Sequence, residues 1–115
     1  MNTDKAYLRY VLNCMAEECG EATQDVCKML RVGESNYVPY KPGSPKYDGQ
    51  TYAQRLEQEL VDITALAEML EAEGLITKGW RSRKRRTEKK ARVDKWMTHD
   101  FWYRRRKKTA KTKKT

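Results

Sequence analysis

Two stretches of the chain carry apolar residues at alternating steps of three and four, the spacing of a helix with one buried face. In the first stretch these apolar positions are Leu8, Leu12, Met15, Cys19, Ala22, Val26 and Met29. In the second stretch they are Leu56, Leu60, Ile63, Ala67 and Leu70. The pattern predicts one helix that stops near Gly33 and another from about Thr51 to Glu73, ended by Gly74. The expected fold class is all-α, an antiparallel helical bundle.

Two matched pairs of carboxylates lie in these helices. Glu18 and Glu21 belong to the first helix, and Glu59 and Asp62 belong to the second. Their i, i+3 spacing places each pair on one helix face, with Cβ atoms roughly 5–6 Å apart. Each pair directly precedes apolar stripe residues, so we expect it on the shoulder of the stripe, where antiparallel packing would bring the four carboxylates together.

Such a cluster would repel itself without cations. Hard carboxylate oxygens without nearby His or Cys suit Mg²⁺ or Mn²⁺ better than zinc. The alternative is that these are ordinary solvated carboxylates, since Glu is common on helix surfaces. The repeated pair favours the cluster, and only Arg55 lies within helical salt-bridge spacing of Glu59 or Asp62.

These residues also carry a resemblance to a known family. The stretches MAEECGEATQDVCKMLRVG (15–33) and LEQELVDITALAEMLEAEGLI (56–76) resemble the EExxE and ExxD motifs of the MazG-like, all-α nucleotide pyrophosphohydrolases. In particular, the chain resembles the short single-domain versions encoded by bacteriophages, and KKARVDKWM (89–97) resembles a later segment of theirs. The resemblance covers about residues 5–97. A Pro-, Tyr- and Gly-rich insert (34–50) makes the interval between the two motifs long.

The resemblance implies hydrolysis of a (deoxy)nucleoside triphosphate to a monophosphate and pyrophosphate, or action on an alarmone such as guanosine tetraphosphate. It implies that Mg²⁺, with Mn²⁺ as a substitute, is held by Glu18, Glu21, Glu59 and Asp62. Glu17 is the first residue of the EExxE motif. It either orients a water or a metal ligand without binding the metal itself, or it is a plain surface residue.

Several basic and aromatic residues are candidates for substrate contacts. The phosphate-binding candidates are Lys28 and Arg31 on the first helix and, as the resemblance implies, Lys89, Lys90 and Lys95. Basic residues near a helix C-terminus also simply complement the helix dipole, which is the alternative for Lys28 and Arg31. The candidates for stacking on a base are Tyr37, Tyr40, Tyr47 and Tyr52. These tyrosines would otherwise attach the insert to the bundle.

The last third of the chain has the opposite charge from the rest. Residues 78–115 hold 18 Lys and Arg against three acidic residues, whereas residues 1–77 hold seven against 13. Val93, Trp96, Met97 and Phe101 form one apolar stripe, which predicts a third helix from about Arg81 to Asp100 that packs on the bundle. The helical domain is then 1–103, and the basic tail (104–115) is expected to be disordered.

This basic region supports a rival function. Basic runs beside Trp96, Phe101, Trp102 and Tyr103 suit a nonspecific nucleic-acid-binding protein, in which the carboxylates would be structural. A further alternative is an enzyme whose basic tail contacts nucleic acid. A di-iron bundle is disfavoured because ExxH motifs are missing and His99 is the only histidine.

Composition narrows the cellular setting and the assembly. Three cysteines without CxxC spacing suggest reduced thiols, and neither a bilayer-length apolar run nor a signal-peptide core is visible. We therefore expect no membrane partner and a cytoplasmic protein, in the host cytoplasm if it is phage-encoded. Two strong helices and a weaker third expose more apolar stripe than one chain covers, which predicts a homodimer or homotetramer.

Overall fold

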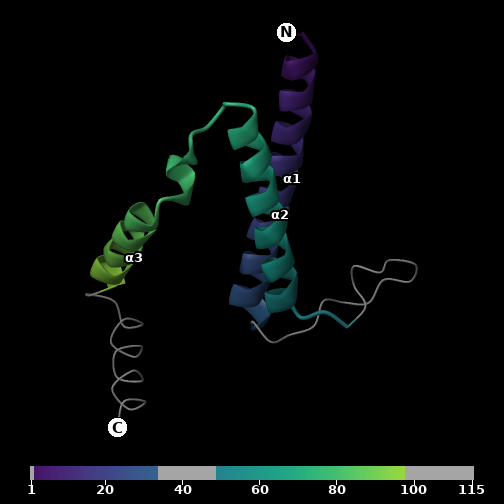
Figure 1. The fold of residues 1–115 in the computed structure, drawn as a ribbon. Helices are drawn as coiled ribbons and strands as arrows, with labels where there is room; N and C mark the ends of the chain where they lie inside the picture. Colours follow the sequence, from purple (N-terminus) through teal and green to yellow (C-terminus); the bar gives the residue numbers. More distant parts are fainter. Residues whose placement is uncertain (1, 34–48, 98–115) are drawn as a thin grey trace. The chain divides into compact units, whose positions relative to one another are not determined.

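The computed structural model describes residues 2–33 and 49–97, and all the regular elements among them are helices. They are α1 (Asn2–Val32), α2 (Tyr52–Ala72), the short 3-10 helix η2 (Lys78–Arg81) and α3 (Arg83–Met97) (Figure 1). The all-α prediction is confirmed for these residues. Tyr37, Tyr40 and Tyr47 and the tail (104–115) lie outside the described residues.

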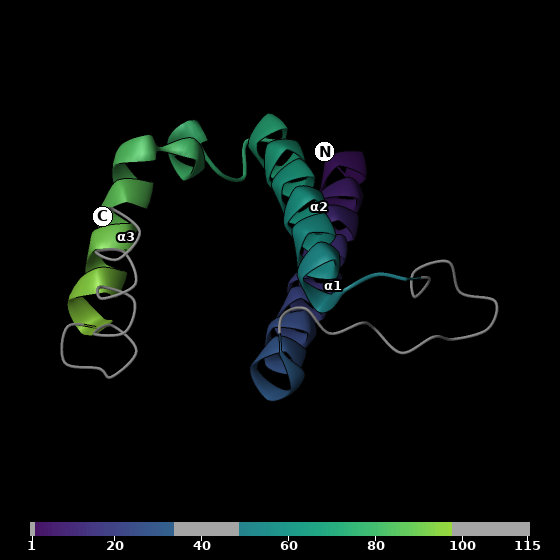
Figure 2. The ribbon, with the colours of Figure 1, turned by 90° about the horizontal axis from the view of Figure 1, so that it is seen from below.

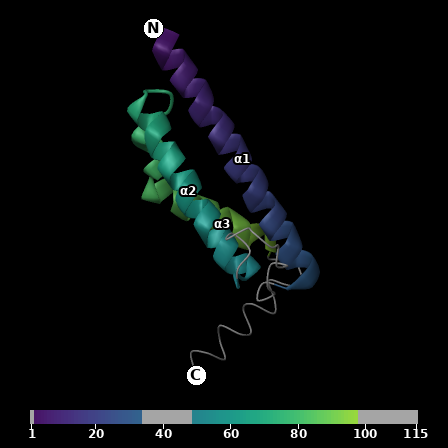
Figure 3. The ribbon, with the colours of Figure 1, turned by 90° about the vertical axis from the view of Figure 1, so that its right-hand side faces the viewer.

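Helices α1 and α2 pack side by side and run antiparallel, as the three ribbon views agree (Figures 1, 2 and 3). Local signals end both helices near the predicted places. Gly33 follows α1 with φ 101°, and its N–H donates to the Met29 carbonyl at 2.8 Å. Gly74 follows α2 with φ 76°, a left-handed conformation that glycine adopts without a Cβ clash.

The start of α2 is held by a capping box. The Thr51 hydroxyl accepts from the Gln54 N–H at 3.1 Å, and the Gln54 side chain accepts from the Thr51 N–H at 2.9 Å. At the other end, the Leu75 N–H donates to the Leu70 carbonyl and the Gly74 N–H to the Glu71 carbonyl. These bonds satisfy backbone groups that a helix end leaves without partners, so both ends of α2 are set locally.

The stripe that α1 buries differs from the predicted one. Leu12 is 41% exposed, Val26 is 40% exposed and Cys19 is exposed. The stripe that is buried or half-buried keeps every second predicted position and replaces each of the others with the residue before it. It comprises Leu8, Val11, Met15, Glu18, Ala22, Asp25 and Met29. Both sets alternate steps of three and four, and one residue turns the helix by about 100°. The predicted stripe was therefore wrong at every second position.

In α2 only one predicted position, Leu60, is wrong, because the other four positions of the predicted stripe are buried or half-buried. Leu60 is 52% exposed, whereas Glu59 is 6% exposed and faces α1. The carboxylates were expected on the shoulder of the apolar stripe, but Glu18 and Glu59 lie within the interface between the two helices. Among the residues that the structure describes, the buried apolar side chains are Val11, Tyr52, Ala67 and Leu70. Carboxylate side chains therefore lie in the middle of an α1–α2 interface that has few buried apolar residues.

The chain divides after Thr77 into two compact units, and the second unit contains η2 and α3. Ser82 caps α3, because its hydroxyl accepts from the Arg85 N–H at 3.1 Å. The third helix is thus present over Arg83–Met97, two residues later than the predicted start. Its predicted packing through Val93 and Trp96 stays a prediction.

No helix in 2–33 or 49–97 has the length and apolar character needed to cross a bilayer.

Candidate metal centre

Three carboxylates from two helices converge near the middle of the α1–α2 interface. Glu18 comes from α1, and Glu59 and Asp62 come from successive turns of α2. One oxygen from each side chain lies within 4.8 Å of the others. Antiparallel packing therefore brings together three of the four carboxylates that the sequence singled out.

The fourth carboxylate, Glu21, lies one turn after Glu18 and lines the same small pocket. The pocket has a volume of about 120 Å³. It is lined by Glu18, Glu21, Gln50, Arg55, Gln58, Glu59 and Asp62. Every lining residue is polar or charged, and none is a Ser or Cys nucleophile. The pocket thus suits cation and phosphate chemistry better than covalent catalysis.

Glu59 has the most perturbed acidity in this cluster. Burial, then hydrogen bonds to Glu18 and Glu21 and their negative charges, raise the pKa of Glu59 from 4.5 to about 8. A protonated Glu59 donates to its carboxylate neighbours, which an ionised Glu59 cannot do. The metal-free cluster therefore retains a proton at neutral pH, and a divalent cation would compete with that proton.

The donor set fits a hard divalent cation. Glu18 Oε2 and Glu59 Oε2 are buried, and apart from the proton that the carboxylates share through Glu59, no donor group among the described residues reaches either atom. Buried oxygen atoms without a partner cost free energy, which a bound cation would remove. The neighbouring ligands are all oxygens, as Mg²⁺ and Mn²⁺ prefer, and Cys19 is exposed rather than part of the pocket.

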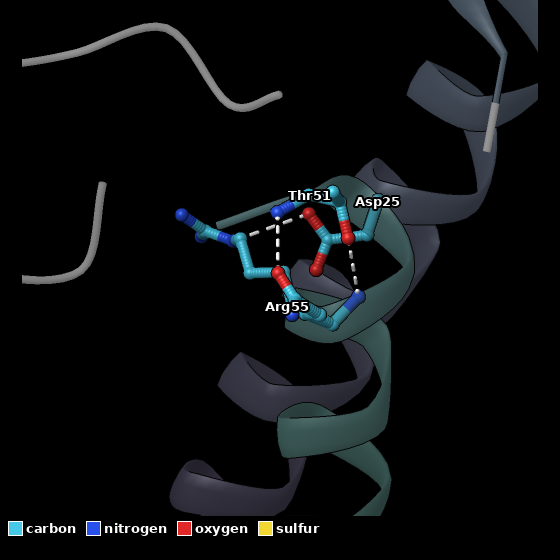
Figure 4. Close-up of polar contacts among 4 residues, drawn as sticks. Asp25, Thr51 and Arg55 are labelled. Atoms are coloured by element: carbon cyan, nitrogen blue, oxygen red, sulfur yellow. Dashed lines mark hydrogen bonds and ion pairs between the residues drawn. The ribbon is translucent and has the colours of Figure 1, made fainter. Parts of the chain in front are cut away.

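An ion pair borders the cluster. Arg55 Nε lies 3.2 Å from Asp25 Oδ1, and the two side chains are only 11% and 5% exposed (Figure 4). Arg55 lies one turn after the cap residue Thr51, to whose carbonyl its N–H donates at 3.0 Å. Burial raises the pKa of the Asp25 carboxyl, the Arg55 charge and hydrogen bond oppose this, and the charge of Glu21 adds to the rise.

The sequence interpretation missed Asp25, Arg55 and Gln58 as parts of this site. Asp25 lies seven residues after Glu18, which places both on one helical stripe, and this spacing was the available signal. Gln58 Nε2 donates to Asp62 Oδ1 at 3.1 Å within α2. Gln58 therefore orients one of the three converging carboxylates, as partners of metal ligands commonly do.

The other predicted residues lie elsewhere. Glu17, Lys28 and Arg31 are exposed on α1 and do not line the pocket. Tyr52 is 7% exposed and belongs to the core, and its stacking on a base stays a prediction. The three α3 candidates are all exposed residues of the second unit, namely Lys89, Lys90 and Lys95. Their contact with phosphate stays a prediction.

Comparison of the chain with protein-family models, curated proteins and solved structures found no match. Its function has therefore to be inferred from its own residues.

Proposed function

We propose that this chain is a metal-dependent nucleotide pyrophosphohydrolase of the MazG-like type, which cleaves a (deoxy)nucleoside triphosphate to a monophosphate and pyrophosphate. The observation that carries this proposal is the convergence of Glu18, Glu59 and Asp62, with two buried oxygens that no donor outside the carboxylate cluster reaches among residues 2–33 and 49–97. These positions match the EExxE and ExxD motifs of the family that the sequence resembles.

The carboxylates of this pocket would hold Mg²⁺, or Mn²⁺ in its place. A bound divalent cation supplies charge neutralisation for the phosphates and a water of lowered pKa. Glu18, Glu59 and Asp62 hold it from two helices, and Glu21 lies beside them as a further ligand or as the acceptor of a proton. Gln58 keeps Asp62 oriented through its 3.1 Å hydrogen bond.

Arg55 supplies positive charge to the same pocket. Asp25 holds its guanidinium through Nε, so the group has a defined orientation next to the carboxylates. Guanidinium groups bind phosphate through paired N–H donors. We therefore assign Arg55 as a phosphate contact and Asp25 as the residue that positions it. A pocket lined by both carboxylates and a guanidinium suits a metal–polyphosphate complex.

A second hollow adjoins this pocket and provides room for a nucleoside. Its volume is about 470 Å³, and it shares Gln50 and Gln58 with the carboxylate pocket. Gln54 also lines it. Glutamine amides both donate and accept hydrogen bonds, as the edges of a base require. The substrate in this proposal is a nucleotide whose phosphates reach the carboxylates from this hollow.

The proposed assembly is a homodimer or homotetramer. The apolar side chains of Leu12, Val26, Leu60 and Val61 are each at least 40% exposed on α1 and α2. Only four apolar residues are buried among the described residues, which is a small core for a chain of this length. A second copy that covers these exposed residues would complete a helical bundle.

The decisive experiment measures pyrophosphate release from a panel of nucleoside triphosphates, deoxynucleoside triphosphates and guanosine tetraphosphate, with Mg²⁺, with Mn²⁺ and with chelator. We expect release only with a divalent cation and only from part of the panel. Glu59→Gln should reduce turnover to near background, because it removes a ligand charge. The matched control is Glu73→Gln, an exposed carboxylate at the end of the same helix, which should keep wild-type turnover.

Arg55→Lys tests the phosphate contact in the same assay. Lysine keeps the positive charge but loses the planar fork of donors, so we expect a raised KM with a smaller change in kcat. Equal turnover of wild type and Glu59→Gln would refute the proposed function.

A further inference from the structure

Helix α3 carries a second surface whose chemistry is unrelated to the carboxylate pocket. The helix spans Arg83–Met97, and eight of its 15 residues are basic. All eight are exposed, and they are Arg83, Lys84, Arg85, Arg86, Lys89, Lys90, Arg92 and Lys95. Only Glu88 and Asp94 oppose them. Such a helix presents a strongly positive surface.

One face of α3 combines this charge with an aromatic side chain. Arg85, Lys89, Arg92 and Trp96 follow at i, i+4, i+7 and i+11, so they lie within an arc of about 60°. We call these four residues the basic stripe. The stripe extends about 16 Å along the helix axis. Trp96 is 82% exposed, and of the large apolar side chains in the described ranges only Leu30, at 83%, is more exposed.

The half-buried residues of α3 point elsewhere. Asp94 and Met97 are its two partly covered positions, and both are turned by about 100° or more from the middle of the basic stripe. A helix that used Met97 for packing would therefore still present the stripe outward. The first turn of the helix is also held in place, because Arg85 Nη1 donates to the Gly79 carbonyl at 3.2 Å.

We propose that the basic stripe binds single-stranded nucleic acid. Arg85, Lys89 and Arg92 would contact successive backbone phosphates, and an unpaired base would stack on the Trp96 indole. Phosphate contacts from Lys and Arg combined with base stacking on an aromatic ring are the usual means of sequence-tolerant single-strand binding. An anionic membrane surface is less suited, because a membrane-bound helix needs a broad apolar face and the stripe has one apolar residue.

The test is a fluorescence anisotropy titration of the full chain with labelled 15-nucleotide single strands and the corresponding duplex, between 50 and 300 mM NaCl. The stripe variant is Arg85→Gln with Lys89→Gln and Arg92→Gln. The control is Arg83→Gln with Arg86→Gln and Lys90→Gln, which lies on another face and lowers the net charge of +9 by the same three units. Each triple variant also removes one arginine–carbonyl hydrogen bond, to Gly79 or to Arg81.

We expect the stripe variant to bind single strands at least about tenfold more weakly than the control, with a log–log salt slope smaller by about 2, or roughly 0.7 for each lost phosphate contact. Trp96→Ala should weaken single-strand binding about tenfold and leave duplex binding nearly unchanged, whereas Trp96→Phe should retain it. Circular dichroism should show equal helicity in all variants.

Three results would overturn the proposal. Equal losses of affinity in the two triple variants would show that binding depends on net charge and not on one face of α3. Unchanged binding in the stripe variant would place the contact elsewhere in the chain. Stripe-dependent binding to vesicles of anionic phospholipid, without binding to oligonucleotides, would identify a membrane surface as the partner instead.

Discussion

Arg55 Nε of α2 lies 3.2 Å from Asp25 Oδ1 of α1, and this ion pair joins the two helices beside the carboxylate cluster. Both side chains are nearly buried, so each charge offsets part of the cost of burying the other. The pair also places a positive charge at the edge of a pocket that is otherwise lined by carboxylates and amides. It therefore links the stability of the helix pair to the orientation of the proposed phosphate contact.

Removing one partner of this ion pair should be costly. Asp25→Ala leaves the Arg55 charge buried without its carboxylate, and we expect a loss of about 3 kcal/mol in the free energy of unfolding. The double variant Asp25→Leu with Arg55→Met removes both charges and should recover most of that loss. Urea denaturation at pH 7 in metal-free buffer measures both. A single variant with the wild-type midpoint would show that the pair does not hold the helices together.

The pH dependence of stability should reveal the buried carboxyl group. Because the pKa of Glu59 is raised from 4.5 to about 8 in the folded chain, folding takes up a proton between these values. The contribution of Glu59 protonation to stability is fully present below pH 4.5 and is lost progressively as pH rises to about 8. The metal-free melting temperature should therefore fall by several degrees from pH 5 to 9, and Glu59→Gln should flatten this dependence. An identical slope in wild type and Glu59→Gln would exclude Glu59 as its source.

Divalent cations should stabilise the folded chain by linkage. If Mg²⁺ binds only the folded cluster, a concentration of 100 times Kd adds about 2.7 kcal/mol to the free energy of unfolding. Glu18→Gln should abolish the rise in melting temperature with Mg²⁺. The neighbouring Glu17→Gln is the control, because Glu17 is exposed and does not line the pocket. A rise of equal size in wild type and Glu18→Gln would argue against the assigned ligand.

The capping box at the start of α2 should contribute measurably to stability. Thr51→Ala removes the hydroxyl that accepts from the Gln54 N–H at 3.1 Å, and we expect a loss of about 1 kcal/mol. Thr64→Ala is the matched control, since its hydroxyl donates to the Leu60 carbonyl inside the helix, where alanine is at least as favourable. Thermal denaturation of the two variants compares these roles. Equal losses would show that the cap has no special importance.

Light scattering should show at least a dimer of the 13.6 kDa chain at micromolar concentration. Leu60 and Val61 are 52% and 58% exposed on α2, and a charge there should disrupt a helical interface between copies. We expect Leu60→Glu to give a monomer. Leu75→Glu is the control, because Leu75 is 47% exposed but lies beyond the end of α2. A wild-type monomer would contradict the proposed assembly.

The sequence alone was sufficient to predict α1 and α2 and the residues near which they end. Thr51 with Gln54 begins α2, and Gly33 and Gly74 adopt the positive φ angles that end α1 and α2. These signals act between residues a few positions apart, so they do not depend on the rest of the fold. The i, i+3 spacing of Glu18 with Glu21 and of Glu59 with Asp62 likewise predicted that each pair lies on one face of its helix.

Only the tertiary structure decided which stripe each helix buries. The series that contains Leu12 and the series that contains Val11 both alternate steps of three and four, and the first is the more apolar because the second includes Glu18 and Asp25. Spacing cannot choose between them, because either gives a continuous stripe. Packing against α2 chose the second, since there Asp25 meets Arg55 and Glu18 meets Glu59. The partner of a buried charge is a property of two helices in register, and one helix read alone does not contain it.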